Sequence, residues 1–298
     1  MAILTTGDLN LPDQILDPWL GRVADLSVVS ALSGQIPMKF GTGHSMTFDI
    51  GEAEFVGEGQ NKGASEFTPT TQTVTPYKFH KTVRFTDEVK WADEDHQLQV
   101  IDQILAKIQP ALARALDYGI LHGINPATGA PVAAMSTKLS DTVNVVDATA
   151  DGSYAFLDAA DALVLADGFV PSDAALTPAF ASRFSQARTD QGVKLYPDFT
   201  LGTTVSTLDG HRAAVSRTVS AEGVAATPTN ILGFVGDFSA IQWGIQRNIG
   251  LHLIEYGDPD GQGDLQRNNQ IAFRAEVVYG WGIADLNAFA KLTTTPAP

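Results

Sequence analysis

The stretch from residue 47 to residue 121 constrains the fold of this chain more than any other. It predicts a strand over Thr47–Phe55, a polar, glycine-rich tip over Gly57–Gly63, a returning strand over Thr71–Thr86 and then a long helix. A two-stranded hairpin of this length has little core of its own to bury, and an isolated hairpin is marginal in water. We therefore expect the hairpin to lie on a neighbouring copy of the chain, which points to an assembly subunit rather than an enzyme.

The returning strand alternates with a period of two residues, as a strand with two different faces does. One face is apolar and consists of Tyr77, Phe79, Val83 and Phe85. The opposite face is polar and mostly basic, and consists of Lys78, His80, Thr82 and Arg84. Lys81 interrupts the apolar face. We expect the apolar face to pack on a core and the basic face to remain at the surface.

Composition excludes several classes of protein. The 298 residues include 34 acidic and 19 basic side chains, for a net charge of −15. Direct binding of nucleic acid needs clustered Lys and Arg side chains. An acidic chain such as this one can enclose nucleic acid but is a poor candidate for binding it. The chain has no cysteine, which excludes disulfides and thiolate chemistry. It shows neither an apolar run of the ~18 residues that span a bilayer nor a signal peptide, so we expect synthesis in a cytoplasm.

The rest of the chain predicts an α+β fold. The helix after the hairpin spans Asp95–Leu121 and is expected to kink near Pro110. Two further helices are predicted over Ala155–Leu165 and over Ala179–Arg188, the second capped by Thr177. Further strands are predicted over Thr203–Leu208, Ala213–Val215, Ile231–Val235, Ala240–Ile245, Leu251–Tyr256 and Gln270–Tyr279.

Motifs that carry chemistry are missing from the sequence. It contains no GxxxxGK[ST], HExxH or GxSxG pattern, and its six histidines are scattered. Asp93–His96 suggests either a cation site or the acidic first turn of the long helix. Asp258–Asp264 resembles a calcium loop but also suits a turn between strands. Gly57–Gly63 offers a phosphate cradle or a flexible tip, so no catalytic, metal or cofactor residue is predicted.

Several short motifs occur in an order that is typical of one family. They are Glu54–Gly59, Lys81–Lys90, Leu116–Pro131, Leu208–Ser216, Gly236–Ser239 with Arg247, and residues 271–289. Together they cover about residues 35–292 and resemble the major capsid proteins of tailed bacteriophages, which have the Hong Kong 97-type fold. Ala213 stands where that family has a proline.

The resemblance implies a division of the chain into four parts. These are an N-terminal arm (1–35), an extended loop with its approach strands (36–86), a peripheral domain with a spine helix (87–123 and 245–276), and an axial domain with the C-terminal tail (124–244 and 277–298). It also implies a structural subunit, not an enzyme, that assembles as pentamers and hexamers into an icosahedral shell around double-stranded DNA. Scaffolding, portal and decoration proteins would be further partners, and the virion capsid would be its location.

For such a shell we expect the hairpin to supply the contacts between subunits. The contact residues would be Glu52, Glu54, Phe55, Val56, Glu58, Lys62 and Phe67. The basic partners on an adjacent copy would be Lys78, Lys81, Arg84 and Lys90. Exposed ion pairs contribute only ~0–1 kcal/mol each, so they would set the register, and apolar burial would supply most of the affinity.

Other readings of the sequence remain open at this point. Some members of the resembled family cross-link subunits through a lysine and an asparagine, for which Lys62 and Asn268 or Asn269 are the candidates. That reaction needs a buried carboxylate to move protons, and the sequence does not identify one. An encapsulin-like compartment shell has the same fold, and an α+β hydrolase with an unrecognised site is the alternative of a different class.

Overall fold

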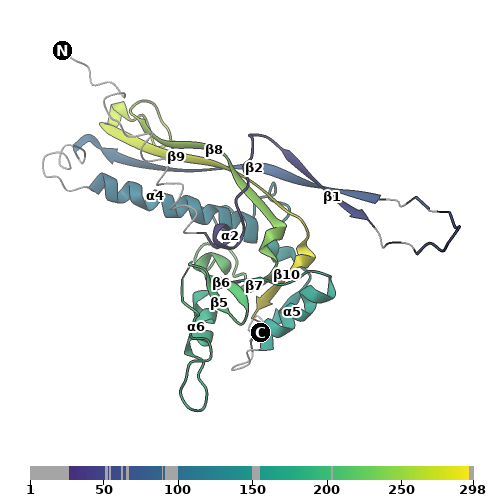
Figure 1. The fold of residues 1–298 in the computed structure, drawn as a ribbon. Helices are drawn as coiled ribbons and strands as arrows, with labels where there is room; N and C mark the ends of the chain where they lie inside the picture. The colour runs from purple at the N-terminus through teal and green to yellow at the C-terminus, as the bar shows by residue number, and fades with distance from the viewer. Residues whose placement is uncertain are drawn as a thin grey trace.

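The computed structural model describes residues 27–50, 53, 55–61, 63–64, 67–88, 90, 100–149, 155–202 and 204–294. These residues form two sheets with helices packed against them (Figure 1). The larger part is a long four-stranded antiparallel sheet, and the smaller part is a compact six-stranded mixed sheet. The mixture of helices and both kinds of sheet confirms the predicted α+β class.

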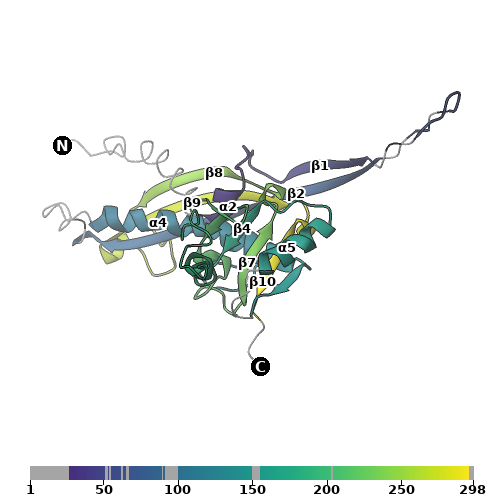
Figure 2. The ribbon, with the colours of Figure 1, turned by 60° about the horizontal axis from the view of Figure 1, so that its bottom comes forward.

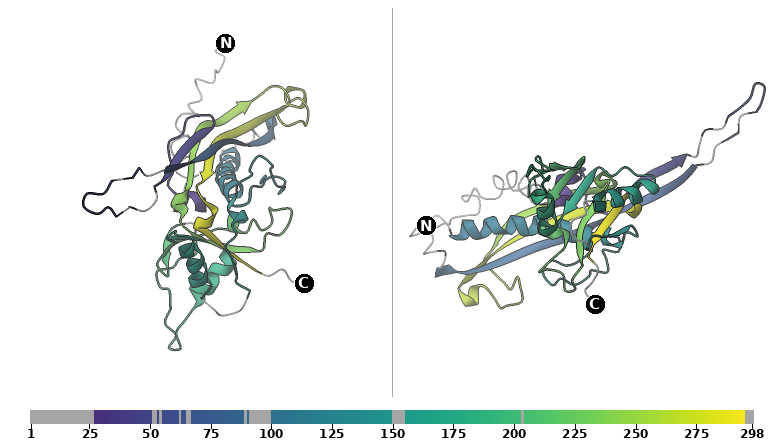
Figure 3. Two further views of the ribbon diagram at one scale, coloured as in Figure 1. Left: turned by 90° about the vertical axis from the view of Figure 1, so that its right-hand side faces the viewer. Right: turned by 90° about the horizontal axis from the view of Figure 1, so that it is seen from below.

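The long sheet has the strand order β1-β2-β9-β8. Its strands are β1 (Gly43–Ile50), β2 (Phe67–Thr86), β9 (Gln270–Ile283) and β8 (Ile241–Ile254). β2 pairs with β9 only over Thr75–Thr86, and its first eight residues pair with β1. The β1–β2 hairpin therefore leaves the body of the subunit and projects into open space, as Figures 2 and 3 show from other sides.

The predicted hairpin is confirmed, with shifted bounds. β1 begins at Gly43 instead of Thr47 and ends at Ile50, and β2 begins at Phe67 instead of Thr71. The shift arises because Ile50 and Phe67 form the last regular pair of the ladder. Residues 43–46 and 68–71, which include Met46 and Pro69, extend the pairing through the backbone, and side-chain alternation does not reveal this.

The apolar face of β2 packs where the alternation predicts. Tyr77 stacks on Trp281 with ring centroids 4.1 Å apart, and Phe79 lies between Tyr279 and Trp281. These side chains join the main hydrophobic core, which also contains the end of helix α4 (Val100–Asp117). Tyr77 and Phe79 are half-buried, so each contributes less than the ~1.5–3 kcal/mol of a fully buried side chain, and together they hold the root of the hairpin on the body of the subunit.

The long helix differs from its predicted form at its end. α4 stops at Asp117, and Tyr118–His122 form a π-helical turn that Gly123 closes with a φ of 62°. A β-carbon on Gly119 would lie 2.6 Å from the Trp281 ring, so only glycine permits this approach. Pro110 lies inside the helix, and the expected kink there stays a prediction; residues 95–99 lie outside the described residues.

The compact sheet has the strand order β3-β10-β7-β4-β6-β5. Its strands are β3 (Val145–Asp147), β10 (Phe289–Thr293), β7 (Ile231–Gly236), β4 (Asp173–Leu176), β6 (His211–Val215) and β5 (Ser206–Leu208). Helices α5 (Ala155–Ala166) and α6 (Pro178–Gln186) bury their apolar residues in a core with this sheet. Both helix predictions are confirmed, and the Thr177 hydroxyl accepts from the backbone amide of Phe180 as the predicted cap.

Short helical segments complete the described fold. They are α2 (Val28–Leu32), η1 (Tyr118–His122), η2 (Leu139–Asp141), η3 (Arg217–Val219), η4 (Phe238–Ala240), η5 (Gln266–Asn268) and η6 (Leu286–Ala288). Within the described residues, no helix combines the length and the hydrophobicity needed to cross a membrane.

Three strand predictions need correction. The strands predicted over Ala240–Ile245 and Leu251–Tyr256 are one continuous strand, β8, because two register shifts absorb the irregular residues between them. The strand predicted from Thr203 begins only at Ser206. The strand predicted from Ala213 begins earlier, at His211, because it pairs with both β4 and β5.

Candidate intersubunit surfaces

The tip of the hairpin presents an unprotected aromatic side chain. Phe55 is 93% exposed, whereas Val56 is half-buried and Glu58 is exposed. A turn at Gly57–Gln60 closes the tip, with Gly59 at a φ of 78°. Of the other predicted contact residues, Phe67 is the first residue of β2, and Glu52, Glu54 and Lys62 lie outside the described residues. Phe55 is thus the clearest candidate for burial by another molecule.

The predicted basic partners fall into two groups. The Lys78 ammonium lies 2.6 Å from the Glu276 carboxylate of the same chain, and Arg84 pairs with Asp258 and Asp260. Both residues therefore already have acidic partners within the subunit. Lys81 is exposed and therefore accessible to the acids of a neighbouring hairpin, whereas Lys90 is half-buried.

The Asp258–Asp264 loop binds the guanidinium group of Arg84 from the same chain. The Arg84 guanidinium donates to the Gly263 carbonyl at 3.1 Å and to the Gln270 side chain at 2.9 Å, besides its two carboxylate partners. The Gly263 amide lowers the pKa of Asp258. Among the described residues, no group of three acidic, histidine or cysteine side chains is arranged to hold a metal. The prediction of a turn between two strands is confirmed, since the loop joins β8 to β9.

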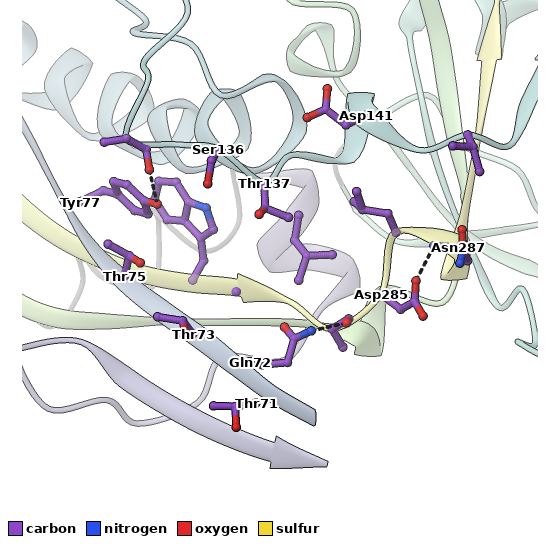
Figure 4. A pocket seen from close by; sticks show the side chains of 17 residues that line it. Thr71, Gln72, Thr73, Thr75, Tyr77, Ser136, Thr137, Asp141, Asp285 and Asn287 are labelled. Atoms are coloured by element: carbon purple, nitrogen blue, oxygen red, sulfur yellow. Dashed lines mark hydrogen bonds between the residues drawn. The ribbon is translucent and has the colours of Figure 1, made fainter. Parts of the chain in front are cut away.

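A groove of about 740 Å³ lies at the root of the hairpin, where β2 separates from β9 (Figure 4). The Tyr77 hydroxyl donates to the Ala134 carbonyl at 3.0 Å, and the Gln72 side-chain amide donates to the Ala284 carbonyl. Asp285 accepts from the backbone amide of Asn287 at 2.9 Å. The Tyr77 and Gln72 hydrogen bonds tie the hairpin root to both neighbouring loops, so contacts within the subunit itself orient the hairpin.

Asp117 joins three parts of the subunit in a fully buried network. Its carboxylate accepts from the Val28 and Val29 amides at 3.1 and 3.2 Å, from the Ser27 hydroxyl, and from the Thr218 hydroxyl at 2.7 Å. The residue lies at the end of α4, its amide donors open α2, and Thr218 belongs to η3. Burial raises the pKa of Asp117, while the hydrogen bonds oppose that rise.

Sequence reasoning missed this role of Asp117, although one signal was present. The residue follows Leu116 and Ala113 on a helix whose neighbouring positions are apolar, and an acid at such a position is rarely buried without partners. The signal shows that partners must exist, but it does not identify them, because Ser27 and Thr218 are about 90 and 100 residues away.

His122 is a second buried polar residue of the same region. Its Nε2 donates to the carbonyls of Thr218 and Val219 at 3.1 and 3.0 Å, so the proton of the neutral ring lies on this atom. Only 4% of the residue is exposed. Burial lowers the pKa of His122 to about 4, and the two carbonyls only partly counteract this effect.

We expect the stability of the subunit to fall below pH 6.5 because of His122. The unfolded chain binds the proton with a pKa near 6.5 and the folded chain only near 4, so the stabilisation is complete above pH 6.5 and is lost progressively toward pH 4. The expected loss is up to about 3 kcal/mol. Urea unfolding between pH 7.5 and pH 4 measures it. His122→Gln, which keeps a donor toward the carbonyls but cannot titrate, should show a flatter pH dependence, and equal slopes in both proteins would contradict the assignment.

One acid–histidine pair bears on the hydrolase alternative. His211 Nε2 lies 3.0 Å from the Asp161 carboxylate, and desolvation raises the pKa of Asp161. A hydrolytic triad needs a nucleophile on the other ring nitrogen. In the described part of the chain, His211 Nδ1 is buried without a hydrogen-bond partner. The pair joins α5 to β6 and therefore has a structural explanation.

The proposed cross-link residues are only partly described. Asn268 and Asn269 are exposed at the end of η5, where Asn269 has a φ of 54°. In the adjacent loop the side chain of Asp258 is 39% exposed and that of Asp260 is 23% exposed, and both carboxylates pair with Arg84. Lys62 lies outside the described residues, as does the Asp93–His96 segment, so the cross-link stays a prediction.

Comparisons with known proteins agree with this architecture. The model of the phage capsid family matches residues 8–294. The chain belongs to the phage capsid family. It is 24% identical over 296 residues to the probable major capsid protein gp17 of Mycobacterium phage D29, covering 95% of this chain and 89% of the relative.

Solved structures extend the likeness to the fold of this capsid protein. A structure from Mycobacterium phage Ogopogo has a TM-score of 0.79 and 43% identity, covering 90% of this chain and 92% of that one. A structure from Gordonia phage Cozz has a TM-score of 0.76 and 30% identity, covering 91% and 87%. The capsid protein has the Hong Kong 97-type fold that the sequence motifs predicted, and its role is that of a structural major capsid protein.

Proposed function

We propose that each capsid protein lays its β1–β2 hairpin across a neighbouring copy, and that many such contacts close the icosahedral head shell of a tailed phage. The observation that carries this proposal is the hairpin itself, whose first eight β2 residues have only β1 as a strand partner and whose Phe55 is 93% exposed. Burial of one phenylalanine side chain contributes about 2–3 kcal/mol.

The charges of the hairpin support a contact that is guided by electrostatics. Glu52, Glu54 and Glu58 give this segment an acidic character. The exposed Lys81 of an adjacent copy would be the main basic partner, and the half-buried Lys90 a second one. Pairs of this kind contribute little energy but fix orientation. The hairpin and the long sheet would then belong to the extended-loop and peripheral regions, and the compact sheet to the axial domain.

The remaining partners follow from the role of a shell protein. We infer that the shell encloses double-stranded DNA without reading its sequence, since the chain has a net charge of −15. Scaffolding, portal and decoration proteins would complete the head, and synthesis would take place in the cytoplasm of the bacterial host. The subunit would act structurally, without catalysis.

Electron microscopy of the purified protein tests the proposal. We expect closed particles of uniform size after expression of the chain, alone or with its scaffolding protein, and only small oligomers or monomers would contradict it. Nucleic acid in particles from infected cells supports a phage head, whereas a packaged enzyme would favour an encapsulin-like compartment. Denaturing electrophoresis of the same particles separates a monomer band of 31.7 kDa from the ladder that a Lys62–Asn cross-link would produce.

A further inference from the structure

Charge is distributed very unevenly within the compact sheet region. Residues 139–182 contain seven aspartates and no lysine, arginine or histidine. Residues 183–217 contain five Lys or Arg and three aspartates. In a chain with a net charge of −15, the second segment is thus positive and the first is strongly negative. Solubility alone does not require such a separation.

The strand order places one strand of each segment, β3 and β5, at opposite edges of one sheet. β3 forms one edge and β5 the other, with four strands between them. α5 contacts β3 and β10, whereas α6 leads into the loop before β5. Figure 1 accordingly shows α5 on one side of the compact sheet and α6 with β5 on the other. The edge strands β3 and β5 are therefore far apart, although the two segments meet inside the sheet, where β4 pairs with β6 and Arg212 lies 2.6 Å from Asp173.

Exposed apolar side chains accompany the charges at the first edge. From Asp141 to Thr149 the residues alternate strictly between exposed and buried. The exposed members include Val143, which is 79% exposed, and Val145, which is 47% exposed. We call Asp141, Val143, Val145 and Asp147 the acidic edge. It presents two exposed valines between two carboxylates. Val145 and Asp147 lie on the same side of β3, whereas Asp141 is the last residue of η2 and lies 3.7 Å from the Lys138 ammonium of its own chain.

The opposite edge carries a matching set. An antiparallel bridge between Arg188 and Lys194 places these two exposed basic residues side by side. Val193, Leu195 and Leu201 are 61, 44 and 54% exposed. The loop is tied to β5 by a 3.3 Å hydrogen bond from the Thr200 amide to the Ser206 hydroxyl. We call Arg188, Val193, Lys194, Leu195 and Leu201 the basic edge.

We infer that the acidic edge of one copy docks on the basic edge of the next, head to tail, and so closes the rings of the shell. Two different, complementary patches on one subunit make a heterologous contact, which generates a ring when the rotation closes. Isolated apolar residues at a surface are ordinary, but clusters at both ends of one sheet with opposite charge favour a second copy as the occupant. The inference rests on the proposed function and identifies the surfaces through which its rings form.

Charge reversal tests this pairing. Asp141→Lys with Asp147→Lys makes both edges basic, and Arg188→Glu with Lys194→Glu makes both edges acidic. Each double variant should lower the yield of particles at least tenfold at low salt, and the quadruple variant, with both edges exchanged, should restore it to within about twofold. Glu222→Lys with Glu255→Lys changes two exposed acids elsewhere and serves as the control with the same charge change.

Mixing the two double variants gives a sharper result. A copy with two basic edges docks only on a copy with two acidic edges, so the two must alternate around a ring. Alternation is possible in a six-membered ring and impossible in a five-membered one. The mixture should therefore form hexamers, seen by native mass spectrometry, but no closed shells, because closed icosahedral shells need five-membered rings.

The outcomes distinguish this inference from the proposed function. Circular dichroism first establishes that each variant is folded, and the quadruple variant shows that the substitutions themselves are tolerated. If the wild-type chain and both double variants all form normal particles, the edge pairing is overturned and the shell function is left intact. A folded quadruple variant without particles would also overturn it. A wild-type chain that never assembles would overturn both.

Discussion

Replacement of residues 51–66 by Asn-Gly is expected to abolish particle formation while the subunit still folds. Ile50 and Phe67 are paired in the antiparallel ladder, and a two-residue Asn-Gly turn closes such a pair. The shortened hairpin keeps β1, β2 and the hydrogen bonds of its root, so unfolding by urea should change by less than about 1 kcal/mol. The tip residues that we propose to lie on a neighbour are lost, and electron microscopy should show no shells.

A single substitution at the tip tests the same contact more finely. Phe55→Ser removes about 2 kcal/mol of apolar burial per subunit, which corresponds to about a 30-fold higher concentration for assembly. Light scattering against protein concentration measures this threshold. Tyr256→Ser removes a different aromatic side chain, which is 67% exposed, and should leave the threshold unchanged. Normal particles from the shortened chain would show that the tip of the hairpin is dispensable and that the proposed tip contact is wrong.

Asp117→Ala is expected to destabilise the folded subunit by about 3–5 kcal/mol. The substitution leaves four donors without their acceptor, namely two backbone amides and the hydroxyls of Ser27 and Thr218. A buried donor that loses its partner costs about 1–3 kcal/mol, and part of this cost is recovered by relaxation or entry of water. Urea unfolding measures the loss, and limited proteolysis should show faster cleavage near Ser27 because α2 loses its anchor.

Graded substitutions separate the hydrogen bonds from the change in volume. Asp117→Asn keeps the shape but only one acceptor oxygen, so an intermediate loss is expected. Thr218→Val removes one donor and should cost about 1 kcal/mol. Glu222→Ala, at an exposed acid, should remain within about 0.5 kcal/mol of the wild type. An Asp117→Ala protein as stable as the Glu222→Ala protein would show that the network contributes nothing.

Much of the fold followed from local patterns in the sequence. The alternation around Tyr77 and Phe79 predicted which face of β2 enters the core, and that face packs on Tyr279 and Trp281. The Thr177-Pro178 pair predicted the start of α6 within one residue. Patterns of this kind depend only on residues a few positions apart in the chain, so they can be recognised from the sequence alone. Element bounds were less accurate, since a register shift in β8 or a π-helical turn at Tyr118 depends on packing.

The candidate surfaces were predictable only in part. The exposed Phe55 at the hairpin tip is the kind of contact residue that the sequence indicated, but its partner surface remains a proposal. Lys78 and Arg84 were expected to face a neighbour, whereas the structure pairs them with Glu276 and with the loop after β8. Sequence alone did not reveal these pairs, because the partners lie about 175–200 residues farther along the chain.

By itself, the sequence determined a long hairpin with one apolar face and an acidic chain without cysteine. It also contains a series of motifs that places the chain among phage capsid proteins. Only the tertiary structure decided that Asp117 joins the ends of three segments and that Arg84 binds the Asp258–Asp264 loop of its own chain. It also decided that the acidic edge and the basic edge lie at opposite ends of one sheet. The physical reason is the same in each case. Periodicity and capping are local, whereas strand order and buried hydrogen bonds join residues that only the folded chain brings together.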